Sequence, residues 1–253
     1  MFGTIIQDAY TKDETNQIAE ALEDLCNPSR THGWSSAGIY CFWDYTTKEV
    51  LYIGLARDLL ERFKQHNGII RVDPKGCKIK KIEEYFQSKQ KLGYSIFVQS
   101  SMHQPFGRKN KDILGSYTED QFPFAHYPID DIKVVEGILI ECFLKKHGDL
   151  PPWNRVGGST NGQAAATDGN YILIESLTHP NITPLIARYT LRELSADDNA
   201  TYLWYEEYLH AARMSMLMHG ISFNQALEQI KIIDSTTYNR IIDDKYLHHK
   251  LIF

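Results

Sequence analysis

The sequence predicts an α+β fold, in which a small antiparallel or mixed β-sheet is flanked by helices and followed by a helical C-terminal region. Three runs of aromatic and β-branched residues, at 37–43, 50–54 and 94–100, are typical of strands. Helical patterns occupy residues 58–66 and 131–146. A chain of 253 residues is long enough to bury one sizeable core or two modest ones.

The N-terminal part, residues 1–35, is expected to be a helical extension. An apolar stripe recurs at helical spacing through residues 13–26, and Thr11 or Asp13 is available as the N-cap. The first two strands follow and are joined by the polar segment DYTTKE. This arrangement predicts an antiparallel hairpin with a loop of several residues.

The next segments alternate between regular and irregular patterns. Asp58 is a suitable N-cap for the helix LLERFKQH, which is expected to stop at Asn67-Gly68. A second helix is predicted over 79–91. Proline and glycine residues break any period between residues 101 and 128, and long loops of this kind are often functional.

The C-terminal part reads as a linker, a short strand and helices. Small and polar residues at 157–170 predict a flexible loop, and YILIESL at 171–177 is compatible with a strand. The remainder of 171–253 is mainly helical, with one long helix at 198–218 and two short helices around a turn at 222–243. This last unit has the shape of a helix-turn-helix, but its acidic character favours packing or dimer contact over DNA reading.

Charge is unevenly distributed along the chain. The net charge is −5, yet residues 57–111 contain thirteen basic and five acidic side chains, a surplus of eight positive charges. A local surplus of this kind suits a phosphate backbone, although a solvated lysine-rich helix around residues 75–91 explains it about as well. Within the surplus, Arg57 and the loop residues Arg108, Lys109 and Lys111 are candidate DNA-binding residues.

Cysteine usage and hydropathy bear on the compartment. The four cysteines are scattered, with no CxxC pair and no Cys/His spacing typical of zinc, which favours reduced and buried thiols. We find no leader-like N-terminus and no membrane-length apolar run, so a cytoplasmic protein without membrane association is expected.

Four polar or phenolic side chains are expected to converge around the predicted hairpin. Tyr40 and Tyr52 lie at the centres of the first two strands, and pairing of the strands brings them to one end of the hairpin. Arg62 and His66 are four residues apart and therefore share one face of the following helix. An arginine suits a phosphate and its transition state, and a histidine donates hydrogen bonds or assists proton transfer.

This pattern, GIY, eleven residues, YIG, then an arginine and a histidine, resembles the GIY-YIG nuclease superfamily over residues 36–156. The family also has a glutamate on a later helix and an asparagine shortly after it. Glu136 and Asn154 match these positions, and Glu136 is preferred over Glu141 because its helical face carries the expected apolar residues. The resemblance implies a GIY-YIG nuclease core with insertions at 67–93 and 101–128.

The resemblance further implies hydrolysis of a phosphodiester in double-stranded DNA. Mg²⁺, for which Mn²⁺ may substitute, would be held by Glu136, with Glu141 as the alternative. Tyr40, supported by His66, would take the proton from the attacking water, and Tyr52 would position the water or the phosphate. Arg62 would stabilise the phosphorane charge, and Asn154 would hold the site or the backbone.

Several readings of the function stay open from the sequence. A restriction or defence enzyme is favoured by the embedded insertions and the compact C-terminal region, and a two-strand cut at a symmetric site would favour a homodimer or sequential nicking. A repair or mobile-element nickase is an alternative. A protein that keeps this fold to bind DNA or regulate, without cleavage, has no need of all six motif residues.

Overall fold

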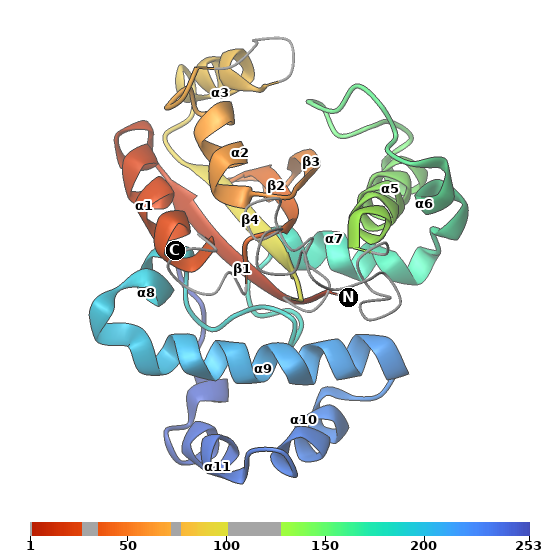
Figure 1. Ribbon diagram of the computed structural model, residues 1–253. Coiled ribbons are helices and arrows are strands. Elements are labelled where there is room, and N and C mark those ends of the chain that lie inside the picture. Colours follow the sequence, from red (N-terminus) through yellow and green to blue (C-terminus); the bar gives the residue numbers. More distant parts are fainter. Residues whose placement is uncertain (1, 27–34, 72–76, 101–127) are drawn as a thin grey trace, which may run out of the picture.

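The computed structural model describes residues 2–26, 35–71, 77–100 and 128–253 (Figure 1). It confirms the α+β fold, with a four-stranded antiparallel sheet of order β1-β4-β2-β3 flanked by helices. The strands are β1 Phe2–Tyr10, β2 Gly38–Asp44, β3 Val50–Ala56 and β4 Leu92–Gln99. The sheet therefore contains the three predicted strands and one that the sequence analysis missed.

The missed strand is β1, and it corrects the expectation of a purely helical extension at 1–35. Ile6 pairs with Ile96, so β1 forms the outer neighbour of β4. Every residue of β1 is buried, on both faces of the sheet. For this reason the sequence shows no alternation of apolar and polar residues that would have indicated a strand. The helix predicted at 13–26 is present as α1, Thr15–Cys26, after a short 3₁₀ turn that Thr11 caps.

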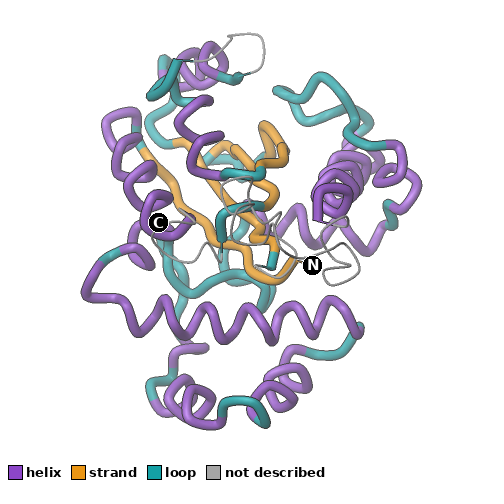
Figure 2. The backbone as a smooth tube through the Cα atoms, in the orientation of Figure 1, coloured by secondary structure: helices purple, strands orange, loops and turns teal. Residues whose placement is uncertain are grey.

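Helices cover both faces of the sheet, as Figure 2 shows in outline. On one face, α1 and α2 (Leu59–His66) pack against a core that includes Tyr40 and Phe42. On the other face, α5 (Pro128–His147) and α7 (Tyr171–Thr178) pack against a second core. Strands β1, β2 and β4 are consequently buried on both faces, whereas β3 is partly exposed.

The segment 157–178 differs from its sequence-based description. Residues 160–165 of the expected flexible loop form helix α6, Thr160–Ala165, which packs on α5. A side chain at Gly137 would lie 2.7 Å from the carbonyl oxygen of Ser159, so the close approach of α6 requires glycine there. The strand predicted at 171–177 is helix α7, because Ile174 and Leu177, three residues apart, share its buried face.

The remaining helices follow the predicted pattern, with α3 ending earlier than the expected residue 91. They are α3 Ile79–Phe86, α8 Leu191–Ser195, α9 Ala200–His219, α10 Phe223–Lys231 and α11 Ser235–Asp243. In Figure 1, α9 runs along the β1 side of the sheet, and α10 and α11 lie beyond it. No described helix combines the length and apolar character needed to cross a membrane.

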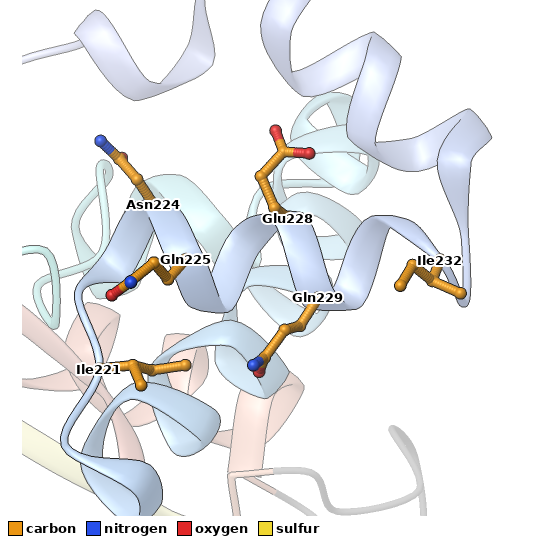
Figure 3. Close-up of a pocket in the computed structure, with 6 residues that line it drawn as sticks. All are labelled: Ile221, Asn224, Gln225, Glu228, Gln229 and Ile232. Carbon is orange, nitrogen blue, oxygen red and sulfur yellow. The ribbon is translucent and has the colours of Figure 1, made fainter.

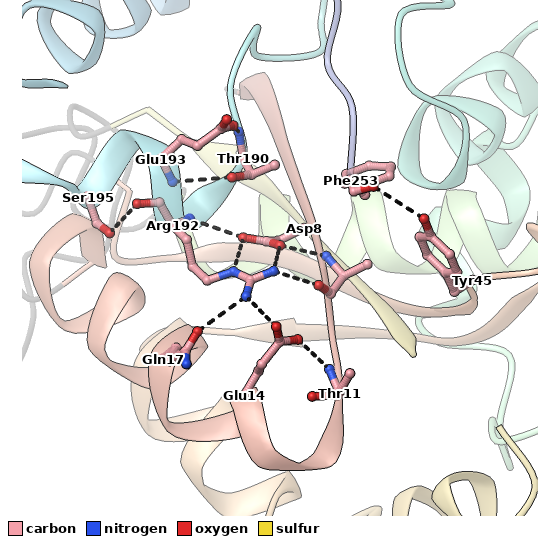
Figure 4. Close-up of polar contacts among 11 residues, drawn as sticks. Asp8, Thr11, Glu14, Gln17, Tyr45, Thr190, Arg192, Glu193, Ser195 and Phe253 are labelled. Atoms are coloured by element: carbon pink, nitrogen blue, oxygen red, sulfur yellow. Dashed lines mark hydrogen bonds and ion pairs between the residues drawn. The ribbon is translucent and has the colours of Figure 1, made fainter. Parts of the chain in front are cut away.

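The C-terminal region is attached to β1 by a charged contact (Figure 4). The buried carboxylate of Asp8 accepts hydrogen bonds from the Arg192 guanidinium, at 2.8 Å from Nη2 and 3.2 Å from Nε, and from the Arg192 backbone N–H at 3.1 Å. The same guanidinium donates to the carbonyl oxygen of Ala9 at 2.7 Å. A forked pair of this kind fixes orientation as well as distance, so α8 is held in register with the first strand.

Candidate active site

The two motif tyrosines lie next to each other on the β2–β3 hairpin. Across the ladder Tyr40 faces Gly54 and Phe42 faces Tyr52, and the ring centroids of Tyr40 and Tyr52 are 5.7 Å apart. A Cβ atom on Gly54 would lie 2.6 Å from the Tyr40 hydroxyl oxygen. The glycine of YIG is therefore needed because the Tyr40 ring lies over it.

Helix α2 brings Arg62 and His66 to the Tyr40 hydroxyl. The helix begins after Asp58, whose side chain accepts a hydrogen bond from the Glu61 backbone N–H at 2.8 Å. Arg62 Nε donates to the Tyr40 oxygen at 3.2 Å, and His66 Nε2 lies 2.7 Å from the same oxygen. The predicted common face of Arg62 and His66 is confirmed, and both side chains meet one phenol.

A backbone contact determines which nitrogen of His66 carries the hydrogen. The Lys78 backbone N–H donates to His66 Nδ1 at 2.9 Å, so Nδ1 is the acceptor of the neutral ring. Nε2 then carries the hydrogen and donates to Tyr40. Burial, followed by the charges of Arg62 and Lys78, lowers the pKa of His66 to about 3, so the ring is neutral near pH 7.

The Tyr40 hydroxyl is protonated in this environment. Burial raises the pKa of Tyr40 well above its ordinary value of 10, and the nearby Tyr52 adds to this, whereas the Arg62 charge and hydrogen bond lower it. Burial dominates, so the field of Arg62 alone does not produce a low-pKa phenol. The two N–H donors nevertheless point at the oxygen on which negative charge would develop, and that arrangement favours the phenolate once it forms.

The other two motif residues lie at the free edge of β3. Asn154 donates from Nδ2 to the Ile53 carbonyl oxygen at 2.8 Å and accepts from the Ile53 backbone N–H at 3.0 Å, as a neighbouring strand would. Glu136 of α5 accepts from the Leu55 backbone N–H at 3.1 Å. Side chains from two later segments thus satisfy the backbone groups that β3 turns away from β2.

Glu136 belongs electrostatically to the tyrosine cluster. Burial raises the pKa of Glu136, against the Leu55 hydrogen bond and the charge of Arg62. Burial also raises the pKa of Tyr52, and the charge of Glu136 adds to this. Glu141, the alternative, pairs instead with Lys145 at 3.9 Å, one helical turn further along α5. The contacts therefore support Glu136 as the site carboxylate.

The expected DNA-binding residues are only partly visible. Arg57 is exposed between β3 and α2, while Arg108, Lys109 and Lys111 lie outside the described residues. Lys78 was counted in the basic surplus but not assigned to the site, although its Nζ lies 4.5 Å from the centroid of the Tyr52 ring. No sequence motif links Lys78 to His66, because Lys78 belongs to a separate element and lies at the start of α3.

A divalent cation would find one carboxylate here. Among the described residues there is no group of three or more histidine, cysteine, aspartate or glutamate side chains that could hold a metal ion. Glu136 has one oxygen bonded to Leu55 N–H, and its second carboxylate oxygen is a hard donor of the kind that Mg²⁺ accepts together with several waters. The residues present fit a water-rich magnesium site and do not fit a closed protein cage.

Two surface hollows are separate from this cluster. One of about 540 Å³ lies along α10 (Figure 3) and is lined by Ile221, Asn224, Gln225, Glu228, Gln229 and Ile232. The other, of about 560 Å³, lies beside α5 and α7 and includes Cys142, Lys145 and Tyr171. Neither is lined by a residue of the tyrosine cluster.

A comparison of the chain with protein-family models, with curated proteins and with solved structures finds no match.

Proposed function

We propose that this chain is a metal-dependent DNA endonuclease that hydrolyses phosphodiester bonds. The observation that carries the proposal is the convergence of Arg62 Nε and His66 Nε2 on the Tyr40 hydroxyl, with Tyr52 beside it. Glu136 stands within electrostatic reach of Arg62 and Tyr52. This combination of two phenols, a guanidinium and one carboxylate suits attack by water on a phosphodiester.

Tyr40 is the proposed acceptor of the proton from the attacking water. The reacting form is the small fraction of Tyr40 present as phenolate, whose proton has been lost to solvent. As the water oxygen bonds to phosphorus, one water proton passes to the phenolate oxygen, and the bond from phosphorus to the 3′ oxygen breaks with its electron pair going to that oxygen, which is then protonated by solvent. His66 and Arg62 stabilise the phenolate by N–H donation, and His66 does so as a neutral ring whose tautomer the Lys78 backbone sets. Tyr52 positions the water or the phosphate.

The negative charge of the transition state is the second requirement. Arg62 presents a planar cation to the phosphorane oxygens. Mg²⁺ held by Glu136, with Mn²⁺ as a substitute, would supply further charge neutralisation at the phosphate and the departing oxygen. Asn154 acts through Ile53, by keeping β3 and therefore Tyr52 in place.

The proposal is tested by digesting supercoiled plasmid and phage DNA with Mg²⁺, with Mn²⁺ and with EDTA. Glu136→Gln keeps the acceptor for Leu55 N–H but removes the negative charge that would hold the metal ion. Its cleavage rate should fall by roughly 10³-fold, which corresponds to a loss of several kcal/mol of transition-state stabilisation. Glu141→Gln is the matched control and should cleave normally, whereas Arg62→Ala should be inactive. Metal-independent cleavage, or equal activity of the two glutamate variants, would contradict the assignment.

The pH dependence of the rate tests the proton acceptor. Because the pKa of Tyr40 lies well above 10 and that of His66 is about 3, neither group titrates between pH 6 and 9. The single-turnover rate should therefore rise by about tenfold for each pH unit across this range, as the small phenolate fraction grows. An inflection near pH 6.5 that disappears in His66→Gln would instead identify His66 as the base.

A restriction or defence enzyme in the cytoplasm is the finer form of the proposal, acting on double-stranded DNA as a homodimer or by sequential nicking. Discrete fragments from phage DNA would support site-specific cutting, and relaxed circles as the end product would support a nickase. DNA binding without cleavage under any metal condition would leave a binding or regulatory protein as the function.

A further inference from the structure

Lys78 contributes to the tyrosine cluster through both its backbone and its side chain. Its backbone N–H bonds to His66 Nδ1, and its ammonium lies over the ring of Tyr52, 4.5 Å from the centroid. Arg62, in contrast, interacts with the hydroxyl groups of Tyr40 and Tyr52. Two cations therefore approach Tyr52 at different places, one at its hydroxyl and one at its ring face.

Two charged groups near Lys78, Arg155 and Arg62, have the same sign as Lys78 itself, and the Cys77 thiol acts in the opposite direction. Burial, then the charges of Arg155 and Arg62, lower the pKa of its ammonium. Other lysines near α3 pair with acids, since Lys81 lies 3.2 Å from Glu84 and Lys89 lies 3.3 Å from Asp44. Within the described parts of the chain, no carboxylate lies within ion-pair distance of Lys78.

Like charges held near one another cost free energy, and an anion bound among them recovers it. Arg155 directly follows Asn154, whose side chain is tied to β3, so the Arg155 backbone is anchored beside the site while its side chain is exposed. A nucleic-acid strand offers a phosphate at every nucleotide. A strand whose scissile phosphate meets Arg62 necessarily brings a neighbouring phosphate close by.

We propose that Lys78 and Arg155 form a second phosphate subsite, which binds the phosphodiester next to the scissile one on the same strand. The subsite rests on the proposed nuclease function for its place in catalysis, because it aligns the strand with Arg62 and Tyr40. The Lys78 ammonium would contact phosphate oxygens as a point charge, and the Arg155 guanidinium would contact them through paired N–H groups. Neither contact would distinguish one base from another. The aromatic face of Tyr52 holds the Lys78 ammonium in position for this contact.

The first test measures DNA binding separately from cleavage. A fluorescent duplex is titrated with protein in EDTA at several salt concentrations, and the slope of log affinity against log salt is determined by anisotropy. Lys78→Gln and Arg155→Gln should each make the slope less negative by about 0.9, the loss of one phosphate contact. Lys231→Gln, on α10 far from the cluster, is the control and should leave the slope unchanged. Lys78→Arg should restore it.

The second test measures cleavage by the same variants. Lys78→Gln keeps the backbone N–H that bonds to His66, so the loss should appear as a raised KM with kcat within about threefold of the wild type. A wild type that cleaves, with slopes and KM values unchanged in both variants, overturns the subsite. A wild type that binds without cleaving, with the slopes reduced in the variants, keeps the subsite and overturns the nuclease proposal.

Discussion

The two edges of the sheet are both covered by backbone and side-chain groups, but the part played by side chains differs. At β1, backbone pairs with backbone: Ile5 N–H donates to the Leu185 carbonyl oxygen, and Ala187 N–H donates to the Ile5 carbonyl oxygen, each at 2.8 Å. At β3, a single backbone bond, from Trp153 N–H to the Leu51 carbonyl oxygen at 2.9 Å, is joined by the side chains of Asn154 and Glu136, which bond to the backbone of Ile53 and Leu55.

The difference predicts that the β1 edge contributes to stability and the β3 edge to the proposed activity. At β1, the charged side chain that reaches the edge is engaged within the protein, because Arg192 bonds to Asp8 and to the Ala9 carbonyl oxygen, and helix α9 packs on the strand. At β3, side-chain cover satisfies backbone groups but leaves a carboxylate and an amide beside Tyr52 and Arg62. We therefore expect substitutions behind β1 to change the free energy of unfolding, and substitutions at β3 to change activity more than stability.

The largest expected effect on stability comes from the buried ion pair behind β1. Arg213 Nη1 lies 2.5 Å from Glu206 and also donates to Thr4 at 3.0 Å, and both charged side chains are fully buried. Glu206→Ala leaves the guanidinium without its carboxylate and should lower the free energy of unfolding by about 3–5 kcal/mol in urea titrations. The cleavage rate per folded molecule should not change.

The exposed Glu175 on α7 provides the control, and Glu175→Ala should shift the unfolding free energy by less than about 0.5 kcal/mol. A loss in Glu206→Ala as small as that of the control would mean that the ion pair does not stabilise the β1 side.

The next largest effect is a pH dependence of the free energy of unfolding, to which two buried histidines, His66 and His210, contribute. Burial is the main cause that lowers the pKa of both His66 and His210 to about 3. Above pH 6.5 neither the folded nor the unfolded state takes up these protons. Between pH 6.5 and about pH 3 only the unfolded state takes up these protons. The free energy of unfolding should therefore fall by about 1.4 kcal/mol for each ring with every unit by which the pH is lowered.

Urea titrations between pH 4.5 and 7 check this slope. His66→Gln and His210→Gln should each reduce this slope by one proton independently, because His66 contacts Tyr40 and Lys78 whereas His210 contacts Thr4. Unchanged slopes in both variants would show that these rings are charged in the folded protein.

The smallest stability effect is expected at the β3 edge. Asn154→Ala removes two hydrogen bonds to Ile53 and should cost about 1–3 kcal/mol. The rate of cleavage per folded molecule should fall by at least tenfold, because β3 carries Tyr52. Asn154→Asp keeps the acceptor for Ile53 N–H and should recover part of the stability. Replacing the exposed Asn161 of α6 is the control. Full activity in Asn154→Ala would remove the proposed link between this edge and the site.

Local patterns predicted the residues of the candidate site well. The hairpin follows from two aromatic and β-branched runs, and the Asp58 cap predicts α2, so Tyr40, Tyr52, Arg62 and His66 converge as expected. The sequence favoured Glu136 over Glu141 because of the apolar residues on its helical face, although both lie on one continuous helix. It is the contact of Glu136 with Leu55 that distinguishes them.

Long-range pairing explains what was missed. β1 joins β4 across about ninety residues of chain, and it is buried on both faces, so no local period predicted it. Helix α7 was read as a strand because its apolar residues suit either structure over so short a run. Lys78 reaches the site from a separate element, and its neighbours in space are not its neighbours in sequence.

The sequence by itself determined the fold class, the hairpin and the set of polar groups around Tyr40, because turns, caps and side-chain periods act over a few residues. Only the tertiary structure decided that Asn154 and Glu136 close one edge of the sheet, that Lys78 sets the tautomer of His66, and that the C-terminal helices bury the opposite edge. These contacts join segments far apart in the chain, where packing and burial, not local preference, determine which groups meet.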